Sequence, residues 1–162
     1  MNERYTMRNF KPNRIVCLTE ETVETLYLLG EQDRIVGVTG YAVRPPAVRK
    51  EKVRVGAFTS ADIPKILSLN PDLVLTFSDL QADIAAELIL KGVDVHAFNQ
   101  RSIDGILSMI SMIGSLVGAS TKAEKLINGY TKKLTTLRKK KTEVIKVYIE
   151  EWDEPLISGI LW

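Results

Sequence analysis

The sequence predicts an α/β fold: a parallel sheet flanked by helices, followed by one long helix and the start of a second α/β lobe. Three observations support this prediction. Short apolar runs rich in β-branched residues alternate with stretches of helical periodicity. The connections are short, and parallel strands have to be joined by crossover helices. A stretch near the end of the chain is long enough for a helix of roughly 30 Å.

The first run, 14–19, predicts a strand that ends at Thr19, a residue type able to cap the helix expected over 20–29. Gly30 then ends that helix as a C-cap glycine. Further strands are expected at 35–39, 53–56, 73–76, 93–98 and 144–150, and further helices at 62–69, 81–91, 102–117 and 121–141. Such alternation is typical of a Rossmann-like sheet with helices on both faces.

The pattern divides the chain into three parts. We expect an N-terminal lobe over 14–118, the long helix over 119–142 and the start of a truncated second lobe over 143–162. The last part is rich in apolar residues and holds both tryptophans, whereas chain ends are usually polar. The sequence therefore reads as a longer protein cut just after it enters a second domain.

Composition excludes several function classes. The chain is 45% hydrophobic and 26% charged, as in ordinary globular proteins, and its formal charge of +2 gives no reason to expect a nucleic-acid partner. The basic run 138–141 is expected to complement a helix dipole in solvent. No window approaches the roughly 18 to 20 apolar residues that span a bilayer.

The motifs of common enzyme classes are missing from the sequence. Neither a Gly-x-x-x-x-Gly-Lys segment nor a Gly-x-Gly-x-x-Gly turn follows a predicted strand. His96 is the only histidine, which excludes multi-histidine metal sites, and it is expected to pack or lie at a rim. Cys17, the only cysteine, lies in an apolar run and is expected to be a buried small side chain. We therefore expect no catalytic residue and no resident metal.

Three aromatic residues follow predicted strands. Tyr41, Phe58 and Phe77 come after the strands at 35–39, 53–56 and 73–76. Ligands of open parallel sheets bind at the carboxyl ends of the strands, so these side chains are candidates for one aromatic rim. The alternative is that Phe58 and Phe77 simply pack under loops.

In this order, the motifs resemble the substrate-binding proteins of ABC importers for cobalamin and ferric siderophores. The segments that carry the resemblance are 14–19, 33–41, Pro45-Pro46, Val55-Gly56 and 66–75 (Ile-Leu-Ser-Leu-Asn-Pro-Asp-Leu-Val-Leu). The resemblance covers the chain from Arg14 onward. It implies two α/β lobes joined by a rigid backbone helix, here 121–141, with the ligand between the lobes.

The resemblance also implies site residues. Tyr41 matches a ligand-facing tyrosine, and Phe58 and Phe77 match positions where cobalamin binders present aromatic side chains. Arg44 occupies a position that is often tyrosine, where an arginine could pair with a ligand carboxylate; a solvated loop charge is the alternative. Trp152 resembles a tryptophan in an acidic segment of the second lobe and is a candidate ligand contact.

A further implied residue concerns the permease. The family carries a docking glutamate on the short helix after the aromatic at the Phe58 position, where this chain has Pro64. Asp62 is the nearby acidic residue that could dock on the permease instead.

The expected function is that of a non-enzymatic solute-binding component of an ABC importer, which captures cobalamin or a ferric siderophore without a covalent bond. Its partners would be the small metal chelate and an ABC permease. Its location would be periplasmic or at the cell surface if an export signal has been removed, and cytoplasmic otherwise. Two alternatives stay open: a cytoplasmic corrinoid-handling protein or enzyme that reuses the lobe, and a non-binding fragment that forms a homodimer through 156–162.

Overall fold

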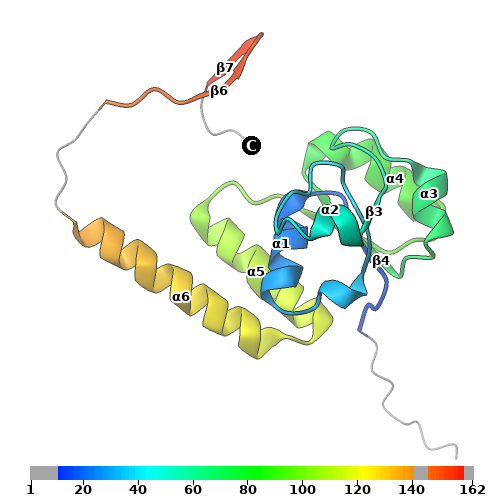
Figure 1. The fold of residues 1–162 in the computed structure, drawn as a ribbon, viewed down its shortest axis with the longest axis horizontal. Helices are drawn as coiled ribbons and strands as arrows, with labels where there is room; N and C mark the ends of the chain where they lie inside the picture. Colours follow the sequence, from blue (N-terminus) through cyan, green and yellow to red (C-terminus); the bar gives the residue numbers. More distant parts are fainter. Residues whose placement is uncertain (1–10, 141–145, 159–162) are drawn as a thin grey trace, which may run out of the picture.

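The computed structural model describes residues 11–140 and 146–158, with the backbone alone described at 151–152 and 157–158. The main body is a five-stranded parallel sheet with the order β3-β2-β1-β4-β5. Figure 1 shows the helices gathered around it. The strands are β1 (Ile15–Cys17), β2 (Ile35–Val38), β3 (Val53–Arg54), β4 (Leu73–Phe77) and β5 (Val95–Phe98). The predicted parallel α/β sheet is thus confirmed.

Helices cover both faces of the sheet, as predicted. The first face packs against α1 (Glu20–Leu28), α5 (Ile103–Val117) and α6 (Ser120–Lys139). The second face packs against α3 (Ile63–Ser68) and α4 (Ala82–Leu90). Three short elements complete the lobe: η1 (Gln32–Arg34), α2 (Val48–Glu51) and η2 (Asp79–Gln81).

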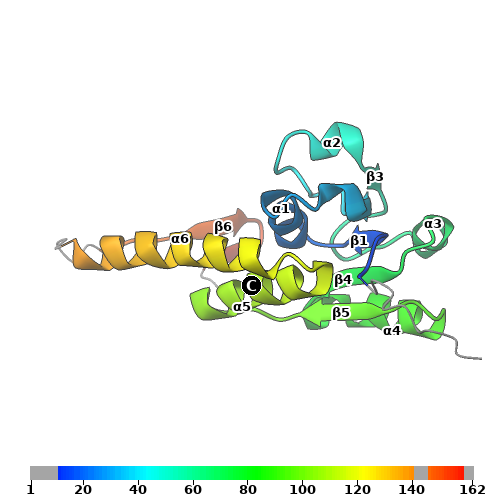
Figure 2. The same cartoon turned by 90° about the horizontal axis from the view of Figure 1, so that it is seen from below.

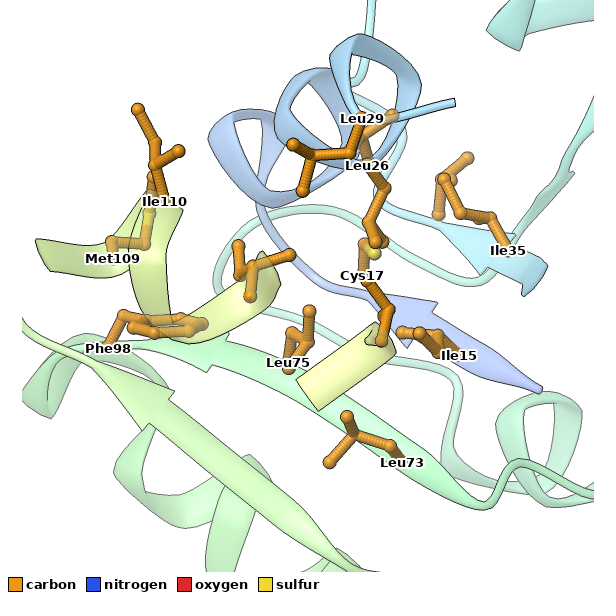
Figure 3. Close-up of a cluster of buried hydrophobic side chains, with 14 of the residues drawn as sticks. Ile15, Cys17, Leu26, Leu29, Ile35, Leu73, Leu75, Phe98, Met109 and Ile110 are labelled. Carbon is orange, nitrogen blue, oxygen red and sulfur yellow. The ribbon is translucent and has the colours of Figure 1, made fainter. Parts of the chain in front are cut away.

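The alternation of side chains along β1 divides the core into two layers. Ile15 and Cys17 belong to the cluster beneath α1 and α5 (Figure 3), whereas Val16 and Leu18 belong to the cluster beneath α3 and α4. All three residues of β1 are completely buried because the strand has a neighbour on each side and helices on both faces. Burial raises the pKa of the Cys17 thiol to about 12, so Cys17 is the inert core residue that was predicted.

The helix ends follow the sequence except at Thr19. This residue occupies the N-cap position of α1, but its side chain accepts no hydrogen bond from the helix backbone. The Thr22 hydroxyl instead donates to the Thr19 carbonyl at 2.9 Å. The expected C-terminal glycine is confirmed, because Gly30 adopts a φ angle of 70°, a conformation that favours glycine, and Gly118 ends α5 in the same way with a φ of 71°.

Helix α6 is joined to the lobe mainly through its first half. Ala123 is buried against α5, and the Lys122 ammonium donates to the Leu29 carbonyl at the end of α1, at 2.8 Å. Lys122 also pairs with Glu31, whose pKa is lowered first by the hydrogen bond from Arg34 and then by that from Lys122. Figure 2 shows the second half of α6 extending past the sheet.

The end of the chain differs from the prediction. The strand expected over 144–150 is wrong at 146–149, which forms no strand and exposes Val147, Tyr148 and Ile149; residues 144–145 lie outside the described part. A strand needs a neighbour to bond its backbone, and within 11–140 and 146–158 nothing pairs with this segment. The observed strands, β6 (Glu150–Asp153) and β7 (Leu156–Ser158), form an antiparallel hairpin. Among the described residues, no helix has the length and apolar character needed to cross a membrane.

Gly114 in α5 and Gly129 in α6 lead to opposite predictions. A Cβ on Gly114 would lie 2.4 Å from the Ala123 Cβ, whereas a Cβ on Gly129 would meet no atom within 4 Å. Gly114→Ala should therefore lower the free energy of unfolding by about 1–3 kcal/mol through overpacking. Gly129→Ala should raise it by about 0.5–1 kcal/mol because alanine favours the helix. Urea denaturation measures both; equal shifts in the two variants would contradict the close packing of α5 and α6.

The start of α3 is capped by the Asp62 side chain. Its carboxylate accepts a hydrogen bond from the Lys65 N–H at 3.0 Å, as an N-cap residue does. Asp62→Ala should reduce the free energy of unfolding by about 1 kcal/mol, and Asp62→Asn should retain most of that contribution. Thermal and urea unfolding of both variants check this expectation, which equal destabilisation by alanine and asparagine would contradict.

Candidate functional site

A cavity of about 350 Å³ lies at the carboxyl edge of the sheet. It is lined by Glu21, Phe58, Phe77, Gln100, Ile106 and Met109. These residues come from the start of α1, the turn after β3, the end of β4, the loop after β5 and the first turns of α5. The parallel topology brings these segments together, because all five strands end at this edge.

Phe58 and Phe77 form the aromatic wall of this cavity. Their ring centroids are 6.5 Å apart and their planes are inclined by 46°. Phe58 lies in the tight turn after Gly56, which is closed by a 2.7 Å hydrogen bond from the Ala57 N–H to the Ser60 carbonyl. Gly56 has a φ of 138°, and a Cβ there would lie 2.3 Å from the Ser60 carbonyl oxygen, so the turn requires glycine.

The two rings differ in exposure. Phe77 is only 7% exposed and packs in the core, while Phe58 is half-buried against it. The Arg101 guanidinium carbon lies 5.2 Å from the centre of the Phe77 ring, and the Arg101 side chain also pairs with Asp79 at 3.4 Å. Both rings thus pack against the core cluster and also line the cavity.

The polar wall of the cavity consists of Glu21 and Gln100. The Gln100 amide donates to a Glu21 carboxylate oxygen at 3.1 Å, across a separation of 79 residues. Glu21 lies in the first turn of α1, where the helix dipole favours a carboxylate, and it also borders a second cavity of about 320 Å³ between α1, α5 and α6. Two apolar side chains of α5, Ile106 and Met109, close the first cavity.

Tyr41 and Arg44 lie in the loop after β2. Tyr41 is 63% exposed and is not among the residues that line the cavity. Arg44 is engaged by α1: its guanidinium lies 3.1 Å from Glu20 and 3.5 Å from Glu24. The hydrogen bond with Glu20, together with the charge of Glu24, raises the pKa of Arg44.

The two remaining predicted residues are Asp62, which is not among the lining residues, and Trp152. Asp62 caps α3, and its exposed carboxylate lies on the element that follows the Phe58 turn. Trp152 belongs to β6, where its backbone pairs with Ile157, and its side chain lies outside the described part of the chain. The structure thus brings Phe58 and Phe77 together and leaves Tyr41, Arg44 and Asp62 outside the lining.

Four of the lining residues were not predicted from the sequence. Gln100 follows a strand at the same edge as the aromatic residues, so the rule that selected Phe58 and Phe77 would have found it had polar residues been included. Glu21 is one of two acidic residues in the first turn of α1, where the helix dipole alone explains them, so no local pattern identifies it as a lining residue. Ile106 belongs to the apolar stripe of α5, and nothing in that stripe distinguishes cavity from core.

The cavity is suited to non-covalent binding. Aromatic and aliphatic walls bury apolar ligand surface, and a carboxylate and an amide can fix its orientation. Within the described residues, no group of three or more histidine, cysteine, aspartate or glutamate side chains is arranged to hold a metal ion.

Comparison with known proteins assigns the chain to a family. The family described as periplasmic binding protein matches residues 15–160. A Bacillus subtilis (strain 168) protein named uncharacterized ABC transporter substrate-binding lipoprotein YvrC is 32% identical over 95% of this chain and 51% of its own length. A cobalamin-binding protein of Halobacterium salinarum is 31% identical over 70% of this chain and 33% of its own length.

A solved structure is similar in fold. The periplasmic vitamin B12 binding protein BtuF of Vibrio cholerae matches with a TM-score of 0.81 and 23% identity, over 91% of this chain and 59% of that one. The chain spans about half or less of the length of the two relatives above. With a family match that runs from β1 to β7, the chain belongs to the periplasmic binding protein family.

Proposed function

We propose that the protein is the solute-binding component of an ABC importer and that it captures a metal chelate, cobalamin or a ferric siderophore. The observation that carries the proposal is the cavity at the carboxyl edge of the sheet, walled by Phe58 and Phe77. The names of two similar proteins, a cobalamin-binding protein and a vitamin B12 binding protein, make cobalamin the first ligand to test. Membership of a substrate-binding family favours this function over the enzyme and the non-binding fragment.

In this proposal, each wall has a separate task. The Phe58 ring and the apolar side chains of α5 bury the flat or greasy surface of the ligand. Glu21 and Gln100 provide the polar groups of the lining. The cavity of about 350 Å³ lies near the lower end of the range for ligand pockets, about 300 to 1,000 Å³. A corrin is a large ligand and would not fit in it completely. The ligand would therefore be held only in part by this lobe.

The missing part of the site would come from a second lobe. We assign residues 14–118 to the first lobe, 119–142 to a backbone helix and 143–162 to the start of the second lobe, which the half-length match to the relatives supports. Trp152 would then contact the ligand from the second lobe. Tyr41, exposed in the loop after β2, would contact it from the rim.

The partner and location follow from the same proposal. The protein would work outside the cytoplasm, as the names of its lipoprotein and periplasmic relatives indicate for those proteins, and would deliver its ligand to an ABC permease. Asp62 would present its exposed carboxylate to the permease while capping α3. Arg44, paired with Glu20 and Glu24, would have to exchange these partners to bind a ligand carboxylate.

The test is direct binding of coloured ligands. The purified protein is mixed with cyanocobalamin or a ferric hydroxamate and passed through a sizing column while the visible absorbance of the ligand is followed. Co-elution with one of them is expected, and titration then gives the affinity. Because this lobe would hold the ligand only in part, a negative result is repeated with a protein that also carries the second lobe. Failure of both ligands to co-elute with either protein would contradict the proposal.

Substitution of the aromatic residues tests the assigned wall. Phe58→Ala should weaken binding of the co-eluting ligand about tenfold, because it removes a stacking surface of the site. The triple replacement of Tyr41, Phe58 and Phe77 by alanine should weaken it further. Leu90→Ala is the control, because Leu90 is 85% exposed on α4 at the other face of the sheet. Unchanged affinity in the triple variant would show that the ligand does not use this wall.

A further inference from the structure

Gln81 is a buried amide directly behind the aromatic wall. Its side chain is only 1% exposed and makes three hydrogen bonds to backbone atoms. The amide oxygen accepts from the Phe77 N–H at 3.0 Å. The amide nitrogen donates to the Phe58 carbonyl at 2.6 Å and to the Leu18 carbonyl at 3.1 Å. Both N–H groups and the oxygen of the amide are thus in use.

These bonds join three segments that are distant in sequence. Leu18 follows β1 and leads into α1, Phe58 lies in the turn after β3, and Phe77 ends β4. Two of the three hydrogen bonds are made with the backbones of Phe58 and Phe77, whose ring centroids are 6.5 Å apart. One side chain therefore fixes both members of the aromatic pair relative to the central strand.

The backbone before Gln81 is shaped so that its side chain reaches back to Phe77. Ser78 has a φ of 53°, a left-handed conformation that is uncommon for a residue with a side chain. The Ser78 N–H donates to the Phe98 carbonyl at 2.7 Å, and its hydroxyl accepts from the Leu80 N–H at 3.3 Å. Backbone strain of this kind persists where the surrounding contacts fix it, often at binding sites.

We propose that Gln81 is the positioning residue of the aromatic wall: it holds Phe58 against Phe77 and so sets the surface on which the ligand lies. The importance of this for ligand binding rests on the function proposed above, whereas the effect on the two rings does not. An amide is specifically required, because one acceptor and two donors must be presented together. Leucine would leave three buried backbone groups without their partner, and an ionised glutamate would place negative charge against two carbonyl oxygens.

The first test needs no ligand. The chain has four phenylalanines, so nuclear Overhauser effects between the Phe58 and Phe77 rings can be assigned by NMR. In Gln81→Leu the effect between the rings should be lost and exchange of the Phe77 amide hydrogen should accelerate. The control, Leu88→Ala, removes a buried side chain from the opposite core cluster and should preserve the ring contact. Both variants are compared under conditions where circular dichroism shows them folded.

The second test uses binding and pH. Gln81→Leu should bind cyanocobalamin, or the ferric hydroxamate if that is the ligand that co-elutes, about tenfold more weakly than the unmodified protein. Gln81→Glu should bind weakly at neutral pH and recover as the pH falls, because a protonated carboxyl can accept from Phe77 and donate to one carbonyl. Leu88→Ala should show the pH profile of the unmodified protein.

The outcomes separate the two proposals. Loss of the ring contact in Gln81→Leu, with recovery of binding by Gln81→Glu on acidification, supports the assignment. A ring contact and an amide exchange rate unchanged in Gln81→Leu would overturn it, whatever the ligand does. If neither ligand binds the unmodified protein, either as this chain or together with the second lobe, the proposed function fails, and the ring contact alone decides the role of Gln81.

Discussion

The structure depends on the parallel pairing of β1 with β2 on one side and with β4 on the other. Parallel strands cannot be joined by tight hairpins, so each connection has to cross a face of the sheet, and the crossing helices bury both faces. The same pairing directs the ends of all five strands to one edge. The two core clusters and the cavity are therefore consequences of a single hydrogen-bonding arrangement.

The candidate site is held by contacts between segments that are far apart in the chain. Glu21 bonds to Gln100 across 79 residues, and Gln81 bonds to the Phe58 carbonyl across 23 residues. Such contacts exist only when the sheet is complete, because each partner is placed by a different strand or helix. Formation of the cavity is thus coupled to folding of the whole lobe, and the loops around it are fixed by side chains reaching across the edge.

Much of the fold could be predicted from the sequence because its signals are local. The β-branched runs identified β1, β2, β4 and β5, and Gly30 marked the end of α1 with the left-handed conformation that was expected. The aromatic pair could also be predicted, because Phe58 and Phe77 follow strands that end at a common edge.

The predictions that failed, and the residues that were missed, depend on long-range contacts. The segment 146–149 has strand-like residues but no neighbouring strand among the described residues, and the hairpin forms further along the chain instead. The partners of Arg44 were also missed: it stays largely exposed, and Glu20 and Glu24 pair with it from α1. The role of Gln81 could not be predicted, since no local pattern reveals which backbone groups a glutamine will reach.

Helix α6 shows how packing is distributed along a single element. Ala123 is buried and Tyr130 half-buried, but from Thr131 to Lys139 every side chain is exposed except the half-buried Leu134. An isolated helical stretch of this length is marginal in water, so its last turns gain little from the lobe and depend on their intrinsic propensity. Local opening of α6 should therefore be graded, with amide hydrogens exchanging fastest near Lys139 and slowest beside Ala123. The first half of α6 is therefore fixed by packing on the lobe, whereas the second half would be stabilised by any further contact along its exposed residues.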